Sequence, residues 1–267
     1  MQRSDIKDVT SANKAAWDAS APLHGAGPGW DTLLASASQP GFSVLDPCLT
    51  ETLQGIGIVG RRAVQVGCNN ARELLSLAAF GAEPVLGIDQ SAGFLAQGEQ
   101  LARAAQLNPR LLEADIYDLP VGLGQFDLVL ITIGVLNWMP DLSRFFEIVA
   151  QLMAPGAVLV IYETHPFLEV FDPDSECPYE PAFSYFDRSP QESLGAITYD
   201  GYKGGDGLAS FWFIHPLGDI VTACSQAGLR LERLTEHPHS NREVDYNIYE
   251  RQTAQLPMSY TLIARAP

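Results

Sequence analysis

The chain has 267 residues, of which 46% are hydrophobic, and it is long enough for one large α/β domain with an insertion. Its formal net charge is −16 and it has no run of Lys or Arg, which argues against a nucleic-acid substrate and against anionic membranes. No apolar stretch reaches the ~20 residues that cross a bilayer, and residues 1–5 lack a signal-peptide core. We expect a cytoplasmic protein, monomeric or homodimeric, that binds neither nucleic acid nor membrane.

Residues 1–60 are expected to form an N-terminal helical cap. An apolar pattern around Trp17 predicts a helix, residues 21–30 are rich in Gly and Pro and predict a loop, and short helices follow, one capped by Asp46. Two interpretations of this part stay open. It is a surface helix with a core tryptophan, or a flap across a ligand pocket in which Trp17, His24 or Trp30 contacts the ligand.

A strand, a tight turn and a helix follow in residues 63–78. The apolar run 63–66 is typical of a buried parallel strand, Gly67 ends it, and leucines at helical spacing begin at Leu74. Such a turn brings backbone N–H groups and a helix N-terminus to one point above the sheet edge, where a nucleoside or carboxylate can bind. The next apolar run ends in Asp89, whose carboxylate can accept both ribose hydroxyls of a nucleoside.

The alternation continues through residue 163. Acidic Asp115 follows a third apolar run, residues 125–131 form a fourth, and residues 157–162 form a fifth; Ser91 and Asp141 are suitable N-caps for the helices between them. This rhythm predicts an α/β fold with a Rossmann-like, doubly wound and mostly parallel sheet, whose core spans residues 61–163.

The last hundred residues depart from this rhythm. Residues 164–213 are rich in aromatic side chains and predict a substrate lid insertion, with an oligomer contact as the alternative. Residues 214–267 complete the core with a helix ended by Gly228, a half-exposed strand at 229–234 and a closing, antiparallel strand at 258–264.

Metal binding is not expected. The cysteines lie far apart, form no CxxC pair and predict reduced thiols rather than disulfides or a zinc site; they are Cys48, Cys68, Cys177 and Cys224. His237 and His239 match no common zinc spacing and are expected in a loop, and His215 is expected to cap or pack at a helix start.

Across nearly its whole length the chain resembles the class I S-adenosylmethionine (SAM)-dependent methyltransferases. The segments that carry the resemblance are 13–18, 64–70, 87–89, 114–116, 126–129 and 152–157. The resemblance implies that SAM is the cofactor and that the acceptor is a small molecule. The sequence departs from the family pattern at the turn that begins with Gly67, where Asn69 and Ala71 replace the second and third glycines of G-x-G-x-G. Asn tolerates left-handed backbone better than most residues, so we expect binding to be retained.

The resemblance also implies roles for individual residues. Gly67, Cys68 and Asn69 would line the methionine part of SAM, and Asp89 would hold the ribose with Gln90 beside the adenine. Asp115 and Ile116 would bind the adenine edge. The segment Thr132, Ile133 and Gly134 would lie beneath the sulfonium, and Trp138 near the ribose or the pocket mouth.

Methyl transfer needs an aligned nucleophile in a dry site, and an oxygen nucleophile often needs a general base. His165, which directly follows the fifth strand, is the candidate base, and Glu163 could orient it or bind a substrate amine. A structural histidine and a solvated acid are the alternatives. We favour O-methylation slightly over N- or C-methylation. The rival functions are a cofactor-binding protein without transfer activity, a different reaction on the same fold, and an NAD-dependent dehydrogenase, which would need a fuller G-x-G-x-x-G turn.

Overall fold

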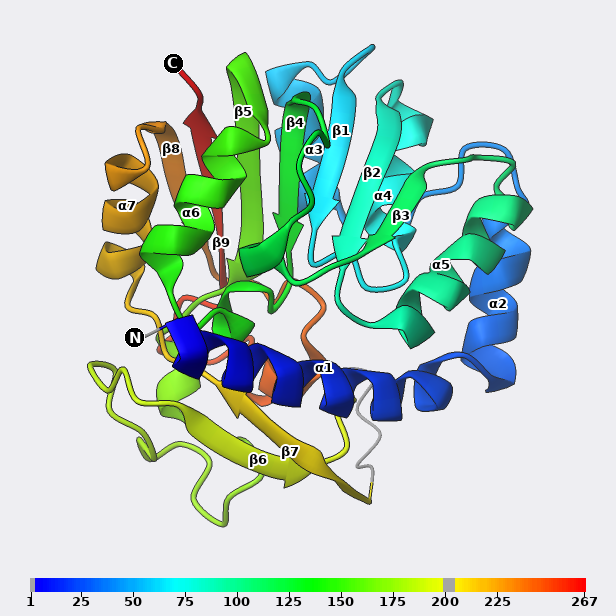
Figure 1. Cartoon of the computed structure of the whole chain (residues 1–267). Coiled ribbons are helices and arrows are strands. Elements are labelled where there is room, and N and C mark those ends of the chain that lie inside the picture. The colour runs from blue at the N-terminus through cyan, green and yellow to red at the C-terminus, as the bar shows by residue number, and fades with distance from the viewer. Residues whose placement is uncertain (1–2, 199–204) are drawn as a thin grey trace.

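The computed structural model describes residues 3–198 and 205–267 and shows a central sheet covered by helices on both faces (Figure 1). The sheet has seven strands in the order β3-β2-β1-β4-β5-β9-β8. Their bounds are β1 Arg62–Val66, β2 Glu83–Asp89, β3 Arg110–Glu113, β4 Phe126–Thr132, β5 Met153–Thr164, β8 Arg230–His237 and β9 Ser259–Arg265. β1 to β5 pair in parallel, whereas β9 runs antiparallel to both β5 and β8, which confirms the predicted doubly wound sheet and its antiparallel closing strand.

Apolar side chains alternate between the two faces of this sheet because successive strand residues point to opposite sides. One face packs on α6 and α7, and the other on α3 and α4. The helices are α1 Arg3–His24, α2 Gly27–Ala37, α3 Pro47–Ile56, α4 Arg72–Ser76, α5 Ala92–Ala104, α6 Leu142–Gln151 and α7 Leu217–Gln226. Among the described residues, none of these helices combines the length and apolarity needed to cross a membrane.

Three helix starts follow the local signals in the sequence. The side chains of Asp46, Ser91 and Asp141 each accept a backbone N–H from the first turn of α3, α5 and α6, respectively. Such caps satisfy N–H groups that have no partner inside the helix. The starts of these three helices could therefore be predicted from the local sequence alone.

The predicted loop at residues 21–30 is wrong. α1 continues to His24 and α2 begins at Gly27, so only a two-residue break separates them. Pro28 lies in the first turn of α2, where its missing N–H would have had no helical partner, so this proline starts a helix instead of interrupting one.

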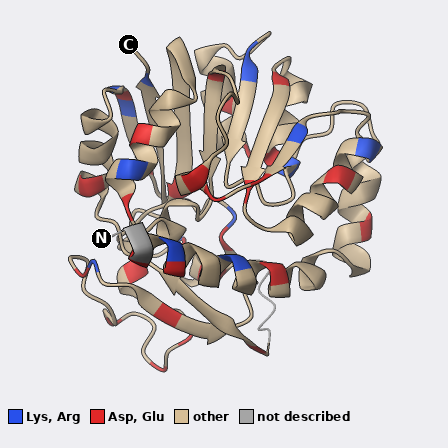
Figure 2. Ribbon diagram, in the orientation of Figure 1, with Lys and Arg blue, Asp and Glu red and all other residues tan. Residues whose placement is uncertain are grey.

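The predicted insertion at residues 164–213 contains a hairpin of β6, Gln191–Gly195, and β7, Asp206–Trp212. Residues 199–204 of this insertion lie outside the described residues. Helix α1 runs along the carboxyl ends of the parallel strands, and the hairpin lies on its other side (Figure 1). The Asn13 amide fixes this arrangement, because it donates to the Phe211 carbonyl (2.8 Å) and accepts from the Phe211 N–H (2.7 Å). Acidic residues are spread over helices and loops, and the few basic residues do not gather into one patch on this view (Figure 2).

Candidate active site

A cavity of about 600 Å³ lies at the carboxyl ends of the parallel strands, beneath α1 and the hairpin. Open α/β sheets bind their ligands at this edge. All twelve residues predicted to contact a cofactor line this cavity: Trp17, Gly67, Cys68, Asn69, Asp89, Gln90, Asp115, Ile116, Thr132, Ile133, Gly134 and Trp138. The structure thus brings them together, whereas His165 and Glu163 are not among the lining residues.

The turn after β1 is left-handed at alternate residues. Gly67, Asn69 and Ala71 have φ values of 64°, 50° and 58°. The Asn69 side chain accepts the N–H of Asn70 (2.8 Å), a local bond that favours this backbone at a non-glycine residue. The turn therefore keeps a glycine-like path without the second and third glycines.

Gly67 is required here for a second reason, because a Cβ atom would stand 2.6 Å from Val135 Cγ2. We expect Gly67→Ala to lower the free energy of unfolding by about 2–4 kcal/mol, from left-handed strain and overpacking together. Gly57 also has a positive φ, of 70°, but open space around it. Gly57→Ala is therefore a matched control that should cost only about 1–2 kcal/mol. Urea unfolding measures both, and equal losses would contradict a steric role for Val135.

Asp89 is the last residue of β2, and its side chain holds two neighbouring backbone segments together. Its two carboxylate oxygens accept the N–H groups of Asn69 (2.7 Å) and Ser91 (2.9 Å), so the acid joins the β1 turn to the start of α5. Burial raises the pKa of Asp89, and its backbone hydrogen bonds oppose that rise. The Cys68 side chain is buried, and its Sγ lies so close to β2 that a Cβ on Gly87 would stand 2.8 Å from it. Burial raises the pKa of the Cys68 thiol far above its usual value, which makes it a packing residue.

Helix α1 closes the cavity on the side of Asp115. Thr10 donates to Asp115 (2.6 Å), which also accepts the Tyr117 N–H (2.9 Å). The Lys14 ammonium donates to the Gln90 carbonyl (2.7 Å) and pairs with Asp18 and Glu113, each at 2.9 Å. These contacts hold the helix over the strand ends.

Trp17 packs edge-to-face on Trp138 and on Phe94, with ring centroids 5.3 and 5.6 Å apart, respectively. It lines the cavity, as the flap interpretation requires. His24 instead contacts the Ile197 carbonyl (3.0 Å), and Trp30 is buried in a separate apolar cluster. Of the three candidates on this part of the chain, the cavity contains only Trp17.

The turn after β4 is strained. Ile133 has a φ of 39°, which a β-branched residue rarely adopts, and Gly134 follows with 86°. The Glu163 carboxylate stabilises this turn by accepting the N–H groups of Gly134, Val135 (2.9 Å) and Leu136 (3.2 Å). Burial raises its pKa to about 7, against the effect of these three hydrogen bonds. Glu163 therefore positions the turn, and the predicted pairing of Glu163 with His165 is absent.

The His165 side chain contacts β8 and does not line the cavity. Its Nε2 lies 2.9 Å from Glu236 on β8, and its Nδ1 accepts the N–H of Phe167 (3.1 Å). Burial lowers the pKa of His165, with Glu236 opposing the shift. The backbone explains this placement, since the His165 N–H bonds to the Met258 carbonyl and turns the chain toward β8. The geometry gives no support to His165 as a base in this cavity.

A different acid lies in the cavity, and sequence reasoning missed it. Glu169 lines it from a 3₁₀ turn, Leu168–Val170, and accepts a hydrogen bond from the Tyr246 hydroxyl (3.0 Å) and another from Asn137. Burial raises the pKa of Glu169 to about 7, although both hydrogen bonds lower it.

Glu243 also lines the cavity. Burial, and to a smaller extent repulsion from Asp245, raises its pKa to about 8. Both carboxyl groups titrate near neutral pH.

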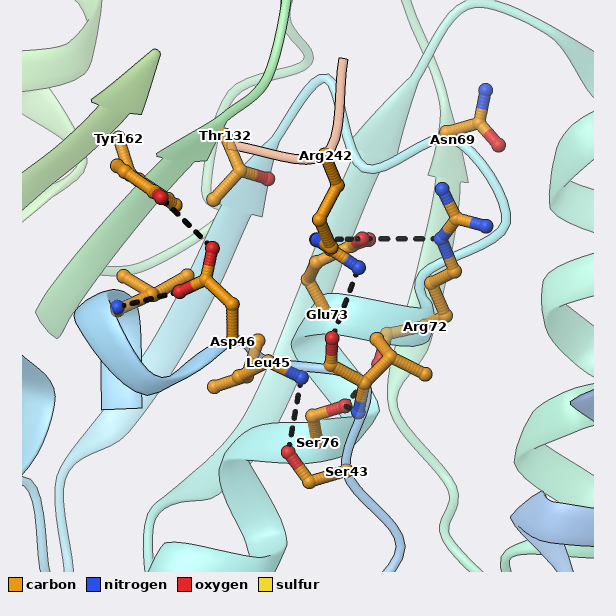
Figure 3. Close-up of polar contacts among 12 residues, drawn as sticks. Ser43, Leu45, Asp46, Asn69, Arg72, Glu73, Ser76, Thr132, Tyr162 and Arg242 are labelled. Carbon is orange, nitrogen blue, oxygen red and sulfur yellow. Dashed lines mark hydrogen bonds and ion pairs between the residues drawn. The ribbon is translucent and has the colours of Figure 1, made fainter. Parts of the chain in front are cut away.

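Two guanidinium groups converge on one buried acid at the other side of the cavity (Figure 3). Arg72 and Arg242 each lie 3.1 Å from Glu73 Oε1, and Arg242 also donates to the Val44 carbonyl (2.9 Å). Burial opposes ionisation of Glu73, but the two arginines lower its pKa. Two cations thus meet one anion at the first turn of α4.

Comparison with known proteins identifies the class of domain. A family model described as a methyltransferase domain matches residues 64–161. Trans-aconitate 2-methyltransferase of Deinococcus radiodurans is 36% identical over 102 residues, which are 38% of this chain and 36% of that protein. Demethylmenaquinone methyltransferase of Thermus thermophilus is 36% identical over 100 residues, 38% of this chain and 44% of that protein. The matches thus span less than half the length of either relative.

A solved structure extends the likeness in fold to the full chain. Magnesium protoporphyrin IX methyltransferase from Synechocystis PCC 6803, crystallised with bound SAH, superimposes with a TM-score of 0.56 and 16% identity, covering 98% of both chains. The match of residues 64–161 to a methyltransferase domain favours the predicted family over the dehydrogenase alternative.

Proposed function

We infer that this chain, a class I SAM-dependent methyltransferase by the domain at residues 64–161, transfers a methyl group from SAM to an oxygen of a small molecule. The observation that carries the inference is the cavity of about 600 Å³, which all twelve sequence-predicted cofactor residues line within a methyltransferase domain. The two relatives above are named for acceptors that are small molecules, trans-aconitate and demethylmenaquinone, which supports that acceptor class.

The residues present fit SAM. Gln65 Oε1, Ser210 Oγ and Arg242 Nε are buried polar atoms with no partner among the described residues, and all three residues line the cavity. Buried polar groups of this kind call for a polar ligand. Asp89 would hold the ribose hydroxyls and Gln90 would flank the adenine. Asp115 and Ile116 would bind the adenine edge.

The remaining cofactor residues complete the site. Gly67, Cys68 and Asn69 would line the methionine part of SAM through their backbones, and Arg72 with Arg242 would bind its carboxylate. Trp17 and Trp138 would exclude water. Thr132, Ile133 and Gly134 would lie below the sulfonium, held in place by Glu163. We propose that α1 and the paired strands β6 and β7 form the lid of the acceptor side.

Bound SAM supplies an electrophilic methyl group. Glu169 then serves as the general base, because its carboxyl lies in the cavity and titrates near neutral pH. Tyr246 and Asn137 orient it by their hydrogen bonds. An acceptor hydroxyl bound in the cavity would give its proton to Glu169, and its oxygen would be the nucleophile for the methyl group that SAM would supply, with S-adenosylhomocysteine as the other product.

Calorimetric titration with SAM tests the cofactor site. We expect micromolar binding to the wild type and a loss of at least about 100-fold in affinity for Asp89→Ala, because two hydrogen bonds to a charged group contribute about 3 kcal/mol or more. Glu83→Ala is the matched control, since Glu83 is an exposed acid at the other end of the same strand. Its affinity should equal that of the wild type.

Absence of SAM binding to the folded wild type would overturn the cofactor assignment. Tight SAM binding without transfer to any member of a broad hydroxyl-, carboxyl- and amine-bearing library would instead favour the two alternatives that keep the cofactor. These are a binding protein without transfer activity, and a different reaction on the bound substrate. Transfer from SAM with a labelled methyl group, followed by mass spectrometry, distinguishes oxygen from nitrogen and carbon acceptors.

A further inference from the structure

A second cluster of reactive side chains lies outside the cavity. Cys48, His237 and His239 come within reach of one another, and one ligand atom from each lies within 4.8 Å of the other two. The three residues come from two distant parts of the chain. Cys48 lies in the first turn of α3, and His237 is the last residue of β8, so its predicted place in a loop is wrong.

The spacing of these atoms is that of metal ligands. Cys48 Sγ lies 3.5 Å from His237 Nε2. Thiolate and imidazole ligands around a tetrahedral zinc ion, at ~2.3 and ~2.05 Å, stand about 3.5 Å apart. His239 lies two residues beyond the end of β8, and its ring stacks on that of His237 with centroids 5.0 Å apart.

Hydrogen bonds around the cluster are compatible with imidazole forms that bind a metal. The Nε2 atom of His237 lies 3.5 Å from the Cys48 Sγ and 3.2 Å from the Thr261 hydroxyl, and in the tautomer protonated on Nδ1 its lone pair faces these two groups. Nδ1 of His239 lies 3.2 Å from the Ser240 carbonyl, to which it donates when protonated. This tautomer leaves Nε2 of His239 with a lone pair for a metal, as outer partners of metal-bound histidines commonly do.

Charged groups of both signs lie near the cluster. Asp46, two residues before Cys48, accepts the Tyr162 hydroxyl at 2.8 Å (Figure 3), and Asp46 and Arg233 both act on His237 electrostatically. A thiolate and the Asp46 carboxylate together balance the two charges of one metal ion. Cys48, His237 and His239 are all half-buried, so an ion can enter from solvent.

We propose that Cys48, His237 and His239 form a zinc-binding site, with water in the fourth position. One thiolate and two imidazoles are the donor set that Zn²⁺ prefers over Mg²⁺ or Ca²⁺. The ion would join α3 to the segment after β8. That segment runs on to buried Asn241, which bonds Thr164 (3.1 Å), and to Arg242 at the cavity. The site is separate from the cavity and does not depend on the methyltransferase proposal.

Cobalt is the first probe, because Co²⁺ replaces Zn²⁺ and is coloured. Metal-stripped protein is titrated with Co²⁺, and we expect one equivalent to produce tetrahedral ligand-field bands and a thiolate-to-cobalt charge-transfer band, both removed by Zn²⁺. Cys48→Ser should abolish the charge-transfer band. Cys48→Ser, His237→Gln and His239→Gln should each weaken Zn²⁺ binding more than the ~10–100-fold that loss of an outer partner costs.

Cys177→Ser is the matched control, since Cys177 is an exposed thiol outside the cluster. It should bind both metals as the wild type does. Saturating Zn²⁺ should raise the Tm of wild type and Cys177→Ser but not that of Cys48→Ser, because only a folded site gains from binding. Circular dichroism of the metal-free variants establishes that each is folded. A charge-transfer band that survives in Cys48→Ser, or vanishes in Cys177→Ser, would overturn the proposal, as would Zn²⁺ affinity equal in all variants.

Discussion

The Glu169→Gln variant is expected to lose about two to four orders of magnitude in kcat while it retains its affinity for SAM. The amide keeps the shape of the side chain and can still contact Tyr246 and Asn137, but it cannot take a proton from an acceptor hydroxyl. Steady-state kinetics with an acceptor identified by the transfer screen gives kcat, and calorimetry gives the SAM affinity. We expect the variant to lose kcat and to keep the SAM affinity of the wild type.

The pH profile provides an independent readout for the same residue. A base must be ionised to act, so the wild-type kcat/KM should rise with pH and level off above about 7, the pKa to which burial raises Glu169. The remaining activity of Glu169→Gln should not show this rise of kcat/KM with pH. Equal kcat values in variant and wild type would show that the acceptor needs no base.

His165→Gln is the control for this experiment. His165 does not line the cavity and bonds to Glu236, so we expect its kcat to stay within a few-fold of the wild type. A large loss in His165→Gln with no loss in Glu169→Gln would restore the histidine as the base and would contradict the geometry.

Glu163→Ala is expected to lower the free energy of unfolding by about 3 kcal/mol or more, because it leaves buried N–H groups without an acceptor, each at about 1–3 kcal/mol. The strained turn at Ile133 and Gly134 loses the group that holds it. Urea unfolding gives the loss from the midpoint and slope. Glu192→Ala removes an exposed acid of the hairpin and should change stability by less than about 0.5 kcal/mol.

The loss in Glu163→Ala should also depend on pH. The pKa of Glu163 is raised by burial from its usual 4.5 to about 7, so the folded state holds its proton more tightly than the unfolded state. That contribution is complete below pH 4.5 and disappears as pH rises through 7. The difference between wild type and variant should therefore shrink from pH 5 to pH 8. A constant difference would mean that the carboxyl is ionised throughout.

The residues at the strand-end edge of the cavity could be predicted from the sequence because their signals are local. A strand, a glycine turn and an acid at the next strand end each occupy a few residues, and the parallel sheet then brings Gly67, Asp89 and Asp115 to one edge. Helix caps such as Ser91 are equally local.

The Glu169 side of the cavity could not be predicted from the sequence because it depends on contacts between distant residues. Glu169 meets Tyr246, which is 77 positions away, and no periodicity marks either residue. Glu163 was placed correctly at the end of β5, but its partners belong to the neighbouring turn after β4. Cys48 and His237 are separated by 189 positions, so nothing in the sequence indicated that the two side chains are in contact.

The double hydrogen bond between the Asn13 amide and Phe211 has a consequence for the behaviour of the protein in concentrated solution. A two-stranded hairpin exposes unpaired backbone groups, which can template pairing with a strand of another molecule. Asn13 presents a donor and an acceptor in the way that a neighbouring strand would, and so occupies the N–H and C=O of Phe211. Helix α1 therefore protects this edge of β7 from aggregation.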